Sequence, residues 1–405
     1  MKKEFLLLKI SVAFILLILL SGCTPKDTTP PSVTWQKTYG GSDYDYAYSI
    51  QKTTDGGYIV AGETYSSGAG LSDVYVLKLD ATGNATWTKT FGGSNYDGAR
   101  SIQQVPDGGY IVAGYTASFG AGASDAYVLK LDASGNVTWT KTFGGSSSDG
   151  ASSIQQVPDG GYIVAGETYS SGAGHDDAYV LKLDATGNVT WQKIFGGSDN
   201  DYARSIQQTA DGGYIVAGYT NSFGAGSWDA YVLKLDATGN ATWTKTFGGS
   251  NNDWAYSIQQ VSDGGYIVAG ITDSSGAGSY DAYVLKLNAS GDATWTKTFG
   301  GSSSDGASSI QQTADGGYIV AGYTNSSGAG SHDVYVLKLD ATGNVTWQKT
   351  FGGSSSDSAS SIQQTADGGY IVAGYTASFG AGASDAYVLK LDADGNTGPY
   401  PTISF

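Results

Sequence analysis

The sequence predicts an all-β protein, a seven-bladed β-propeller whose blades are four-stranded antiparallel sheets. Three observations lead to this prediction: a repeat of 52 residues, four strand-like segments in each repeat, and two partial repeats at the ends that complete each other. The repeat keeps its length from copy to copy, and a tryptophan marks the same position each time. These tryptophans are Trp35, Trp87, Trp139, Trp191, Trp243, Trp295 and Trp347.

One repeat contains four segments with strand character. Ala99–Val105 can form the first strand, and a Pro-Asp-Gly-Gly turn separates it from Tyr110–Thr116, which is rich in β-forming residues. After a loop of Gly, Ser and Ala comes Asp125–Asp132, in which two sets of side chains alternate with the period of a strand. An Asp-Ala-Ser-Gly-Asn hairpin then leads to the fourth strand, Val137–Phe143.

This pattern fits a propeller better than other repeat architectures. A single four-stranded sheet cannot bury its own faces, so neighbouring sheets must stack on it. A β-helix has a shorter period, and an immunoglobulin-like array needs about 100 residues for each unit. Propeller blades have four strands and periods of about 40–50 residues.

The two ends of the repeat region predict how the ring closes. Val33–Tyr39 has the sequence of a fourth strand without the first three, and Ala359–Asp392 supplies three strands without a fourth. Pro399 stands where the next tryptophan would fall, and proline cannot donate a hydrogen bond to a sheet. We therefore expect Val33–Tyr39 to complete the last blade, which removes the exposed edge of an open array.

The repeated tryptophans and aspartates are expected to be structural. Seven tryptophans at one structural position indicate packing between neighbouring blades rather than seven binding sites. Of the 37 acidic residues, 27 are aspartates at four repeated positions, one of which is Asn288 instead. Carboxylates beside Gly-Gly turns and at strand entries readily accept hydrogen bonds from loop amides, so most of them should fix loops.

The N-terminal residues predict an export signal and a lipid anchor. Lys2 and Lys3 precede an apolar run, Phe5–Leu20, which is interrupted by Lys9 and short for a membrane span. The following Leu-Ser-Gly-Cys sequence resembles the cleavage box of a bacterial lipoprotein signal. That resemblance implies that residues 1–22 are removed and that Cys23, the only cysteine, carries a diacylglyceryl anchor. Residues 23–31 would then form a Pro- and Thr-rich tether, and the protein would be extracytoplasmic, at the cell surface or in the periplasm.

Two family resemblances concern the repeat itself. The sequence DGGYIVAGYT-x-S, followed by a Gly-rich stretch and DAYVLKLD, resembles the bacterial seven-bladed propeller repeat family (SBBP) over residues 32–396. This resemblance implies the fold, and it leaves residues 397–405 as a C-terminal tail. Leu79–Trp87 (LDATGN-x-TW) is similar to the Trp-docking hairpin of pyrroloquinoline-quinone-type propeller repeats, with a loop one residue shorter. Nothing outside that hairpin indicates a quinone site, so no cofactor is expected.

Composition narrows the classes of partner. Residues 1–22 hold three lysines and one glutamate, so their removal takes the formal net charge from −16 to −18. This charge is spread around the repeats and argues against binding of nucleic acid, or of an anionic lipid surface, by the propeller itself. We expect a monomeric ring that contacts the membrane through the lipid on Cys23.

The repeats differ from one another mainly in two segments, and these are where we expect binding. One is the loop from the fourth to the first strand, as in Ser42–Tyr48 and Ser250–Tyr256, and the other is the loop that precedes the third strand. An antiparallel meander puts both loops on the same rim, opposite the constant DGG and DA-x-GN turns. The candidate binding residues of this rim are Tyr44, Tyr46, Tyr96, His175, Tyr202, Trp228, Trp254, Tyr280 and His332.

Aromatic rings beside Asp and Asn suit a glycan or an envelope or surface protein as the ligand, with Trp228 and Trp254 as the residues to test. The alternatives are sequence drift of surface loops and a passive envelope scaffold. An enzyme is less favoured, because glycosidases need two distinct carboxylates and the carboxylates here repeat from blade to blade. HExxH, GxSxG, phosphate-loop and calcium-loop motifs are absent from the sequence, so no catalytic or metal-binding residue is assigned.

Overall fold

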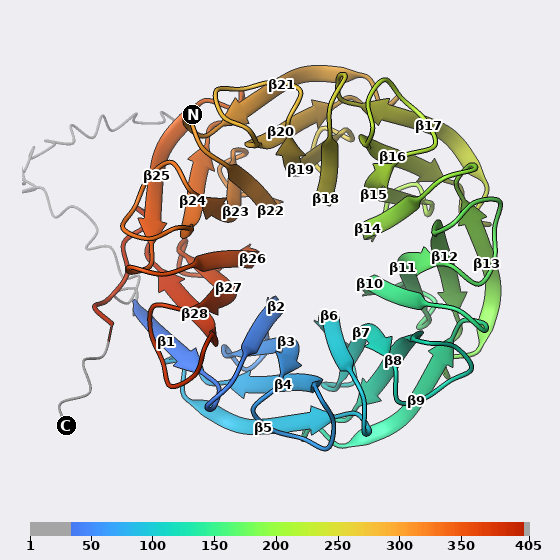
Figure 1. The fold of residues 1–405 in the computed structure, drawn as a ribbon, viewed down its shortest axis with the longest axis horizontal. Coiled ribbons are helices and arrows are strands. Elements are labelled where there is room, and N and C mark those ends of the chain that lie inside the picture. Colours follow the sequence, from blue (N-terminus) through green and yellow to red (C-terminus); the bar gives the residue numbers. More distant parts are fainter. Residues whose placement is uncertain (1–33, 401–405) are drawn as a thin grey trace, which may run out of the picture. The chain divides into compact units, whose positions relative to one another are not determined.

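The computed structural model describes residues 34–400, which form seven four-stranded antiparallel sheets arranged in a ring around a central channel (Figure 1). Within these residues every regular element is a β-strand, as predicted. The predicted signal peptide, Cys23, the tether, Val33 and the tail beyond Tyr400 lie outside the described residues and stay predictions.

The first four blades contain β2 (Asp45–Lys52), β3 (Tyr58–Thr64), β4 (Asp73–Leu79) and β5 (Ala85–Phe91); β6 (Asp97–Gln104), β7 (Tyr110–Thr116), β8 (Asp125–Leu131) and β9 (Val137–Phe143); β10 (Asp149–Gln156), β11 (Tyr162–Thr168), β12 (Asp177–Leu183) and β13 (Val189–Phe195); and β14 (Asp201–Gln208), β15 (Tyr214–Thr220), β16 (Asp229–Leu235) and β17 (Ala241–Phe247). The other three contain β18 (Asp253–Gln260), β19 (Tyr266–Thr272), β20 (Asp281–Leu287) and β21 (Ala293–Phe299); β22 (Asp305–Gln312), β23 (Tyr318–Thr324), β24 (Asp333–Leu339) and β25 (Val345–Phe351); and β26 (Asp357–Gln364), β27 (Tyr370–Thr376), β28 (Asp385–Leu391) and β1 (Trp35–Tyr39).

The ring closes through the N-terminal strand, as predicted. In every blade the first strand lines the centre and the fourth lies at the periphery (Figure 1). In the last blade the outermost strand is β1, which pairs antiparallel with β28 from Trp35 opposite Lys390 to Tyr39 opposite Ala386. The strand begins at Trp35, so Thr34, which was predicted to belong to it, lies before the strand.

The repeated tryptophans pack between neighbouring blades, which confirms their predicted role. The indole of Trp139 on β9 lies edge-on to Tyr162 of the next blade, with 5.9 Å between ring centroids. Its outer edge covers the next blade's β12–β13 turn, where a Cβ added to Gly187 would lie 2.9 Å from Trp139 Cη2. Gly187 also has a φ of +82°, a conformation that favours glycine. The turn glycine and the tryptophan therefore depend on each other.

Hydrogen bonds between the first strands join the blades at the channel. The Oγ of Ser101 accepts a hydrogen bond from the amide of Ile154 in the next blade (3.3 Å). The same contact closes the ring, because the Oγ of Ser361 accepts from the amide of Ile50 (3.3 Å). Each inner strand thus satisfies part of its neighbour's backbone.

The four sets of repeated aspartates fix turns and loops, as expected. Asp97 and Asp125 accept hydrogen bonds from loop glycine amides at 2.9 Å, and both carboxylates are buried. Asp132 accepts a hydrogen bond from the amide of the residue four positions on at 2.8 Å, which closes the hairpin. Asp107 accepts from the amide at the end of its Gly-Gly turn (2.8 Å) and forms an ion pair of 2.7 Å with Lys130.

The lysine–aspartate pairs predict an acid-sensitive fold. Burial raises the pKa of Asp55, but hydrogen bonds from Lys78 and Thr53 outweigh this effect and lower the pKa to about 2. A carboxylate whose pKa is lower in the folded than in the unfolded chain stabilises the fold above its unfolded pKa, and this contribution is lost as the pH falls through the folded value. The equivalent pairs are Lys130–Asp107, Lys182–Asp159, Lys234–Asp211, Lys286–Asp263, Lys338–Asp315 and Lys390–Asp367.

We therefore expect the melting temperature, followed by circular dichroism, to fall as the pH is lowered from about 4 to about 2. Burial raises the pKa of four other carboxylates, those of Asp177, Asp229, Asp281 and Asp385. Their protonation favours the folded chain, so it makes the decrease in melting temperature smaller at the upper end of this pH range. A melting temperature that stays constant or rises down to pH 2 would contradict the prediction.

Candidate functional site

The two variable loops of each repeat lie on one face of the ring, as predicted. Within a blade, the amide of Tyr65 after the second strand donates to the carbonyl of Tyr44 before the first strand (2.8 Å). Between blades, Ser72 before the third strand forms a parallel bridge with Tyr96 before the next blade's first strand. We call this side of the ring the variable face.

The body of the channel is chemically uniform. It is lined by the serine, isoleucine and glutamine that recur in all seven first strands, such as Ser153, Ile154 and Gln155, and its cavity measures about 260 Å³. Side chains that repeat from blade to blade offer no unique position, so this part of the channel provides no basis for selecting one ligand.

A β-bulge directs the variable residues toward the mouth of the channel. In β6 the register shifts between Ala99, which faces Gly114, and Ser101, which faces Ala113, so Arg100 is the extra residue. Bulges of this kind re-aim a side chain. The same shift occurs in every blade, and the seven bulge residues are Tyr48, Arg100, Ser152, Arg204, Tyr256, Ser308 and Ser360.

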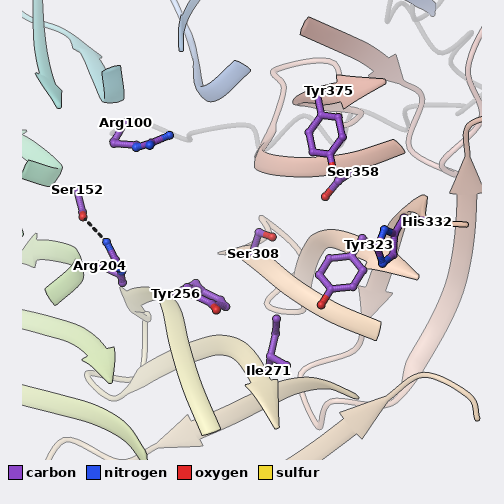
Figure 2. A pocket seen from close by; sticks show the side chains of 10 residues that line it. All are labelled: Arg100, Ser152, Arg204, Tyr256, Ile271, Ser308, Tyr323, His332, Ser358 and Tyr375. Carbon is purple, nitrogen blue, oxygen red and sulfur yellow. Dashed lines mark hydrogen bonds between the residues drawn. The ribbon is translucent and has the colours of Figure 1, made fainter. Parts of the chain in front are cut away.

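These residues and their neighbours enclose a cavity of about 490 Å³ at the channel mouth. Figure 2 shows Arg100, Ser152 and Arg204 on one side of it and the rings of Tyr323, His332 and Tyr375 on the other. The cavity therefore has a basic, hydrogen-bonding side and an aromatic side. Its complete lining is Arg100, Ser152, Arg204, Tyr256, Ile271, Ser308, Tyr323, His332, Ser358 and Tyr375.

Arg204 is firmly held at the edge of this cavity. Its Nη1 lies 3.3 Å from Oε2 of Glu167 on β11 and donates to Ser152 Oγ (3.2 Å), while its Nε donates to the hydroxyl of Tyr219 (3.1 Å). Burial raises the pKa of Glu167, and the attraction of Arg204 opposes this rise. Because the two side chains are about three-quarters buried, removal of one would leave the other charge uncompensated.

Arg100 pairs with Glu63 in the same way but more loosely. Its Nη1 lies 3.9 Å from Oε2 of Glu63, and its guanidinium carbon lies 4.2 Å from the ring centre of Tyr48 and 5.2 Å from that of Tyr115. Glu63 is 3% exposed and accepts hydrogen bonds from the hydroxyls of Ser72 (2.7 Å) and Tyr115 (2.8 Å). A separation of 3.9 Å is longer than a hydrogen bond, so Arg100 keeps capacity for a further acceptor.

A simple rule links the second strand of each blade to the bulge residue of the next. Where the second strand carries glutamate, the next bulge carries arginine, as in Glu63 with Arg100 and Glu167 with Arg204. Elsewhere both positions are neutral: Tyr115 with Ser152, Tyr219 with Tyr256, Ile271 with Ser308, Tyr323 with Ser360, and Tyr375 with Tyr48. The chain thus supplies a matched cation wherever it places a glutamate at this seam.

Of the nine residues expected to form the binding rim, only His332 lines the cavity. Tyr44 and Tyr96 are 45% and 46% exposed on the variable face. His175 is exposed and stacks against Tyr169, with 6.1 Å between ring centroids. It stands one position earlier in its repeat than His332 does, because Asp176 occupies the equivalent position.

The other five expected residues are half-buried. Three of them, Tyr46, Tyr202 and Trp254, lie in first strands and not in the loop, which corrects the sequence interpretation. Ring centroids lie 4.9 Å apart between Tyr219 and Tyr202 and 5.4 Å apart between Tyr219 and Trp228. Trp254 extends the group to Tyr280 at 5.5 Å. These aromatic residues mainly pack on one another beside the mouth.

Sequence reasoning missed Arg100, Arg204, Tyr256, Tyr323 and Tyr375. Two signals were present in the sequence. Arg100 and Arg204 are its only arginines, and they stand two repeats apart at one position, each 37 residues after a glutamate. In addition, the buried alanine and isoleucine of each first strand are three residues apart instead of two or four, and this break in alternation marks the bulge.

The part of the chain that the structure describes contains no helix that is long and apolar enough to cross a membrane. Nor do residues 34–400 bring three or more His, Cys, Asp or Glu side chains together as a metal site would require.

Part of the chain matches a family model that is described as a β-propeller. The family model of a domain of unknown function (DUF5122) beta-propeller matches residues 106–137, 209–241, 262–293 and 365–397. The regulatory protein FlaEY of Caulobacter vibrioides is 26% identical over 271 residues, which make up 60% of this chain and 28% of that protein. The chain therefore spans little more than a quarter of that relative's length, and the similarity to the family model is confined to the four stretches.

Two solved structures are similar at low sequence identity. The Pan2 WD40 domain of Neurospora crassa has a TM-score of 0.54 and 12% identity, with 91% of this chain and 98% of that chain covered. A protein of unknown function from Bacteroides caccae has a TM-score of 0.45 and 15% identity, with 72% and 93% covered. None of these descriptions names a catalytic activity. The chain is a seven-bladed β-propeller similar to the DUF5122 repeats.

The pairing of a second-strand glutamate with the bulge arginine of the next blade gives a prediction for Glu167 and Arg204. Arg204→Ser should lower the free energy of unfolding by about 1–3 kcal/mol, because Glu167 then stays buried without its cation. Adding Glu167→Tyr should restore most of this loss, since it recreates the pair that Tyr115 and Ser152 form. Urea denaturation of the single and double variants measures both effects. Equal stability of the Arg204→Ser variant and the wild type would contradict the assigned role of the ion pair.

Proposed function

We propose that this protein is a lipid-anchored, extracytoplasmic binding module that holds a glycan at the channel mouth of its variable face. The proposal rests on the observation that the side chains at the channel mouth, unlike those of the channel body, differ from blade to blade. The channel body repeats the same serine, isoleucine and glutamine in every blade, whereas the mouth gathers two arginines, a histidine and three tyrosines into one cavity. The residues that repeat in every blade are sufficient to build the ring. The different side chains gathered at one end of the channel therefore support recognition of a ligand there.

The chemistry of the cavity suits a short stretch of sugar. Its volume of about 490 Å³ lies within the range of about 300–1,000 Å³ typical of small-ligand pockets. The rings of Tyr323 and Tyr375 can stack on the apolar face of a sugar, while Arg100, Ser308 and the tyrosine hydroxyls can hydrogen-bond its hydroxyl groups. The exposed rings of Tyr44 and Tyr96 would extend the contact beyond the cavity.

The same features support binding more than hydrolysis. A glycosidase needs two carboxylates on either side of the scissile bond. The glutamates near the mouth, Glu63 and Glu167, are instead paired with arginines, and neither lines the cavity. A protein partner on the variable face is the second candidate, favoured by the exposed Tyr44, Tyr96 and Tyr169. A passive envelope scaffold, in which the mouth has no ligand, is the third.

The binding proposal is tested by screening the detergent-solubilised full chain on a glycan array and measuring affinity for each hit. The double variant Glu63→Tyr/Arg100→Ser, which copies the neutral pair at Tyr115 and Ser152, should weaken binding about ten-fold or more, the loss expected for a charge-assisted hydrogen bond. Tyr323→Ile, which copies Ile271, should also weaken it. Trp228→Ala and Trp254→Ala should weaken it less, since these rings mainly support their neighbours.

A matched control is Asp80→Asn, which copies the natural Asn288 on the opposite face and should leave binding unchanged. Full retention of a glycan by both cavity variants, or no retention of any glycan by the wild type, would refute the proposal. Capture of a defined envelope protein that is abolished by Tyr44→Ser/Tyr96→Ser, which copies the natural Ser148, and not by the cavity variants, would favour the second candidate.

The proposed anchoring of the protein to a membrane depends on a lipid attached to Cys23. Expression in bacteria that are fed a clickable fatty acid should label the wild-type chain and not a Cys23→Ser variant, because the sequence offers no other thiol. The labelled wild type should fractionate with membranes. An unlabelled wild-type chain, or a labelled Cys23→Ser variant, would overturn the lipid anchor without affecting the binding proposal.

A further inference from the structure

The segment that follows the last turn is seated on the closing blade. The hydroxyl of Thr397 donates to the carbonyl of Trp35 (3.0 Å), and the side-chain amide of Gln36 donates to the carbonyl of Gly398 (3.0 Å). The hydroxyls of Tyr400 and Thr38 lie 2.8 Å apart. Residues 397–400 therefore run along β1, the outermost strand of that blade.

The ring of Tyr400 occupies an aromatic site on this blade. It stacks on Phe379 in the β27–β28 loop, with 4.5 Å between ring centroids and 21° between planes. Phe379 in turn lies 6.0 Å from the ring of Tyr387 on β28. The site consists of a loop phenylalanine, a third-strand tyrosine and a fourth-strand threonine hydroxyl, and its occupant is a tyrosine on an extended segment.

Two other blades repeat this site. Phe119 lies 6.0 Å from Tyr127, and Phe223 lies 6.1 Å from Tyr231, the separations found between Phe379 and Tyr387. The threonine that meets the Tyr400 hydroxyl also recurs in both blades, as Thr142 and Thr246. In the remaining four blades the phenylalanine position holds Ser67, Ser171, Ser275 and Ser327.

The two repeated sites differ from the first in exposure. Phe119 is 46% exposed and Phe223 is 45% exposed, whereas Phe379 is partly buried with Tyr400 packed against it. Phe119 and Phe223 thus leave apolar ring surface in water, whereas serine stands at the same position in four blades. Neither Phe119 nor Phe223 lines the mouth cavity, so these sites are separate from the proposed glycan site.

We propose that Phe119 and Phe223 are docking sites for tyrosine side chains on an extended peptide segment of a partner protein. The occupant is inferred from the chain itself, since Thr397–Tyr400 shows which chemistry completes the same arrangement of phenylalanine, tyrosine and threonine. Each stacked ring buries apolar surface and gains the attraction of an aromatic pair. One such contact is weak, so a partner that presents two tyrosine segments binds much more tightly than one that presents a single segment.

The probe is a biotinylated peptide with the sequence of residues 396–401, Asn-Thr-Gly-Pro-Tyr-Pro, displayed on streptavidin and passed over the immobilised full chain. We expect binding by surface plasmon resonance, and at least a ten-fold loss of apparent affinity in the Phe119→Ser/Phe223→Ser variant. Serine is the natural residue in four blades, so this variant should melt at the wild-type temperature. A probe with alanine in place of tyrosine should not bind.

A gain-of-function variant guards against an indirect effect. Ser275→Phe builds a third site beside Tyr283 and Thr298, and it should strengthen binding of the streptavidin probe. Phe379→Ser removes the site that the chain's own Tyr400 occupies. Comparing its binding with that of the wild type shows whether the probe also displaces Tyr400 there. Unchanged binding in the Phe119→Ser/Phe223→Ser variant, or no binding of the tyrosine probe to the wild type, would overturn the proposal. Self-association of the wild type in analytical ultracentrifugation, abolished by that double variant, would assign the sites to a second copy instead and would also overturn it.

Discussion

Each blade is stable only because its neighbours cover its faces. The middle strands carry apolar residues on both faces, so β7 and β8 are almost wholly buried between adjoining blades. The tryptophan of one blade, the turn glycine of the next, and the hydrogen bonds between inner strands repeat this interface around the ring. An array with one uncovered blade would leave such a surface in water, which is the physical reason that β1 must return to β28.

Because every interface uses the same contacts, the residues that make them have little freedom to vary. Asp97, Asp125, Asp107 and Asp132 illustrate this, since each holds a loop or turn by accepting amide hydrogen bonds. Variation is tolerated where a side chain leaves the interface, in the loops of the variable face and at the bulge. Even there the choice is coupled across a seam, because a buried glutamate requires the arginine of the next blade.

Much of the fold could be predicted from the sequence, and much less of the site. Local residue patterns record the periodicity of the chain directly. That periodicity predicts the four strands of a repeat, the closing strand, the packing of tryptophans between blades and the variable face. The lining of the mouth does not, since Tyr256, Tyr323 and Tyr375 come from different blades and resemble the other repeated tyrosines. The expected loop residues Tyr46, Tyr202 and Trp254 proved to lie in strands, where they pack beside the mouth.

The sequence by itself determined the number of blades and the closure of the ring. It also located the variable face, because a constant repeat length forces equivalent residues into equivalent places. Only the tertiary structure decided which variable residues share a cavity. The decisive element is the bulge at Arg100 and its equivalents, where one extra residue turns the side chain from the sheet to the channel mouth. Ring closure then brings Arg100, Arg204, Tyr323 and His332, up to 232 residues apart in the chain, to the same opening.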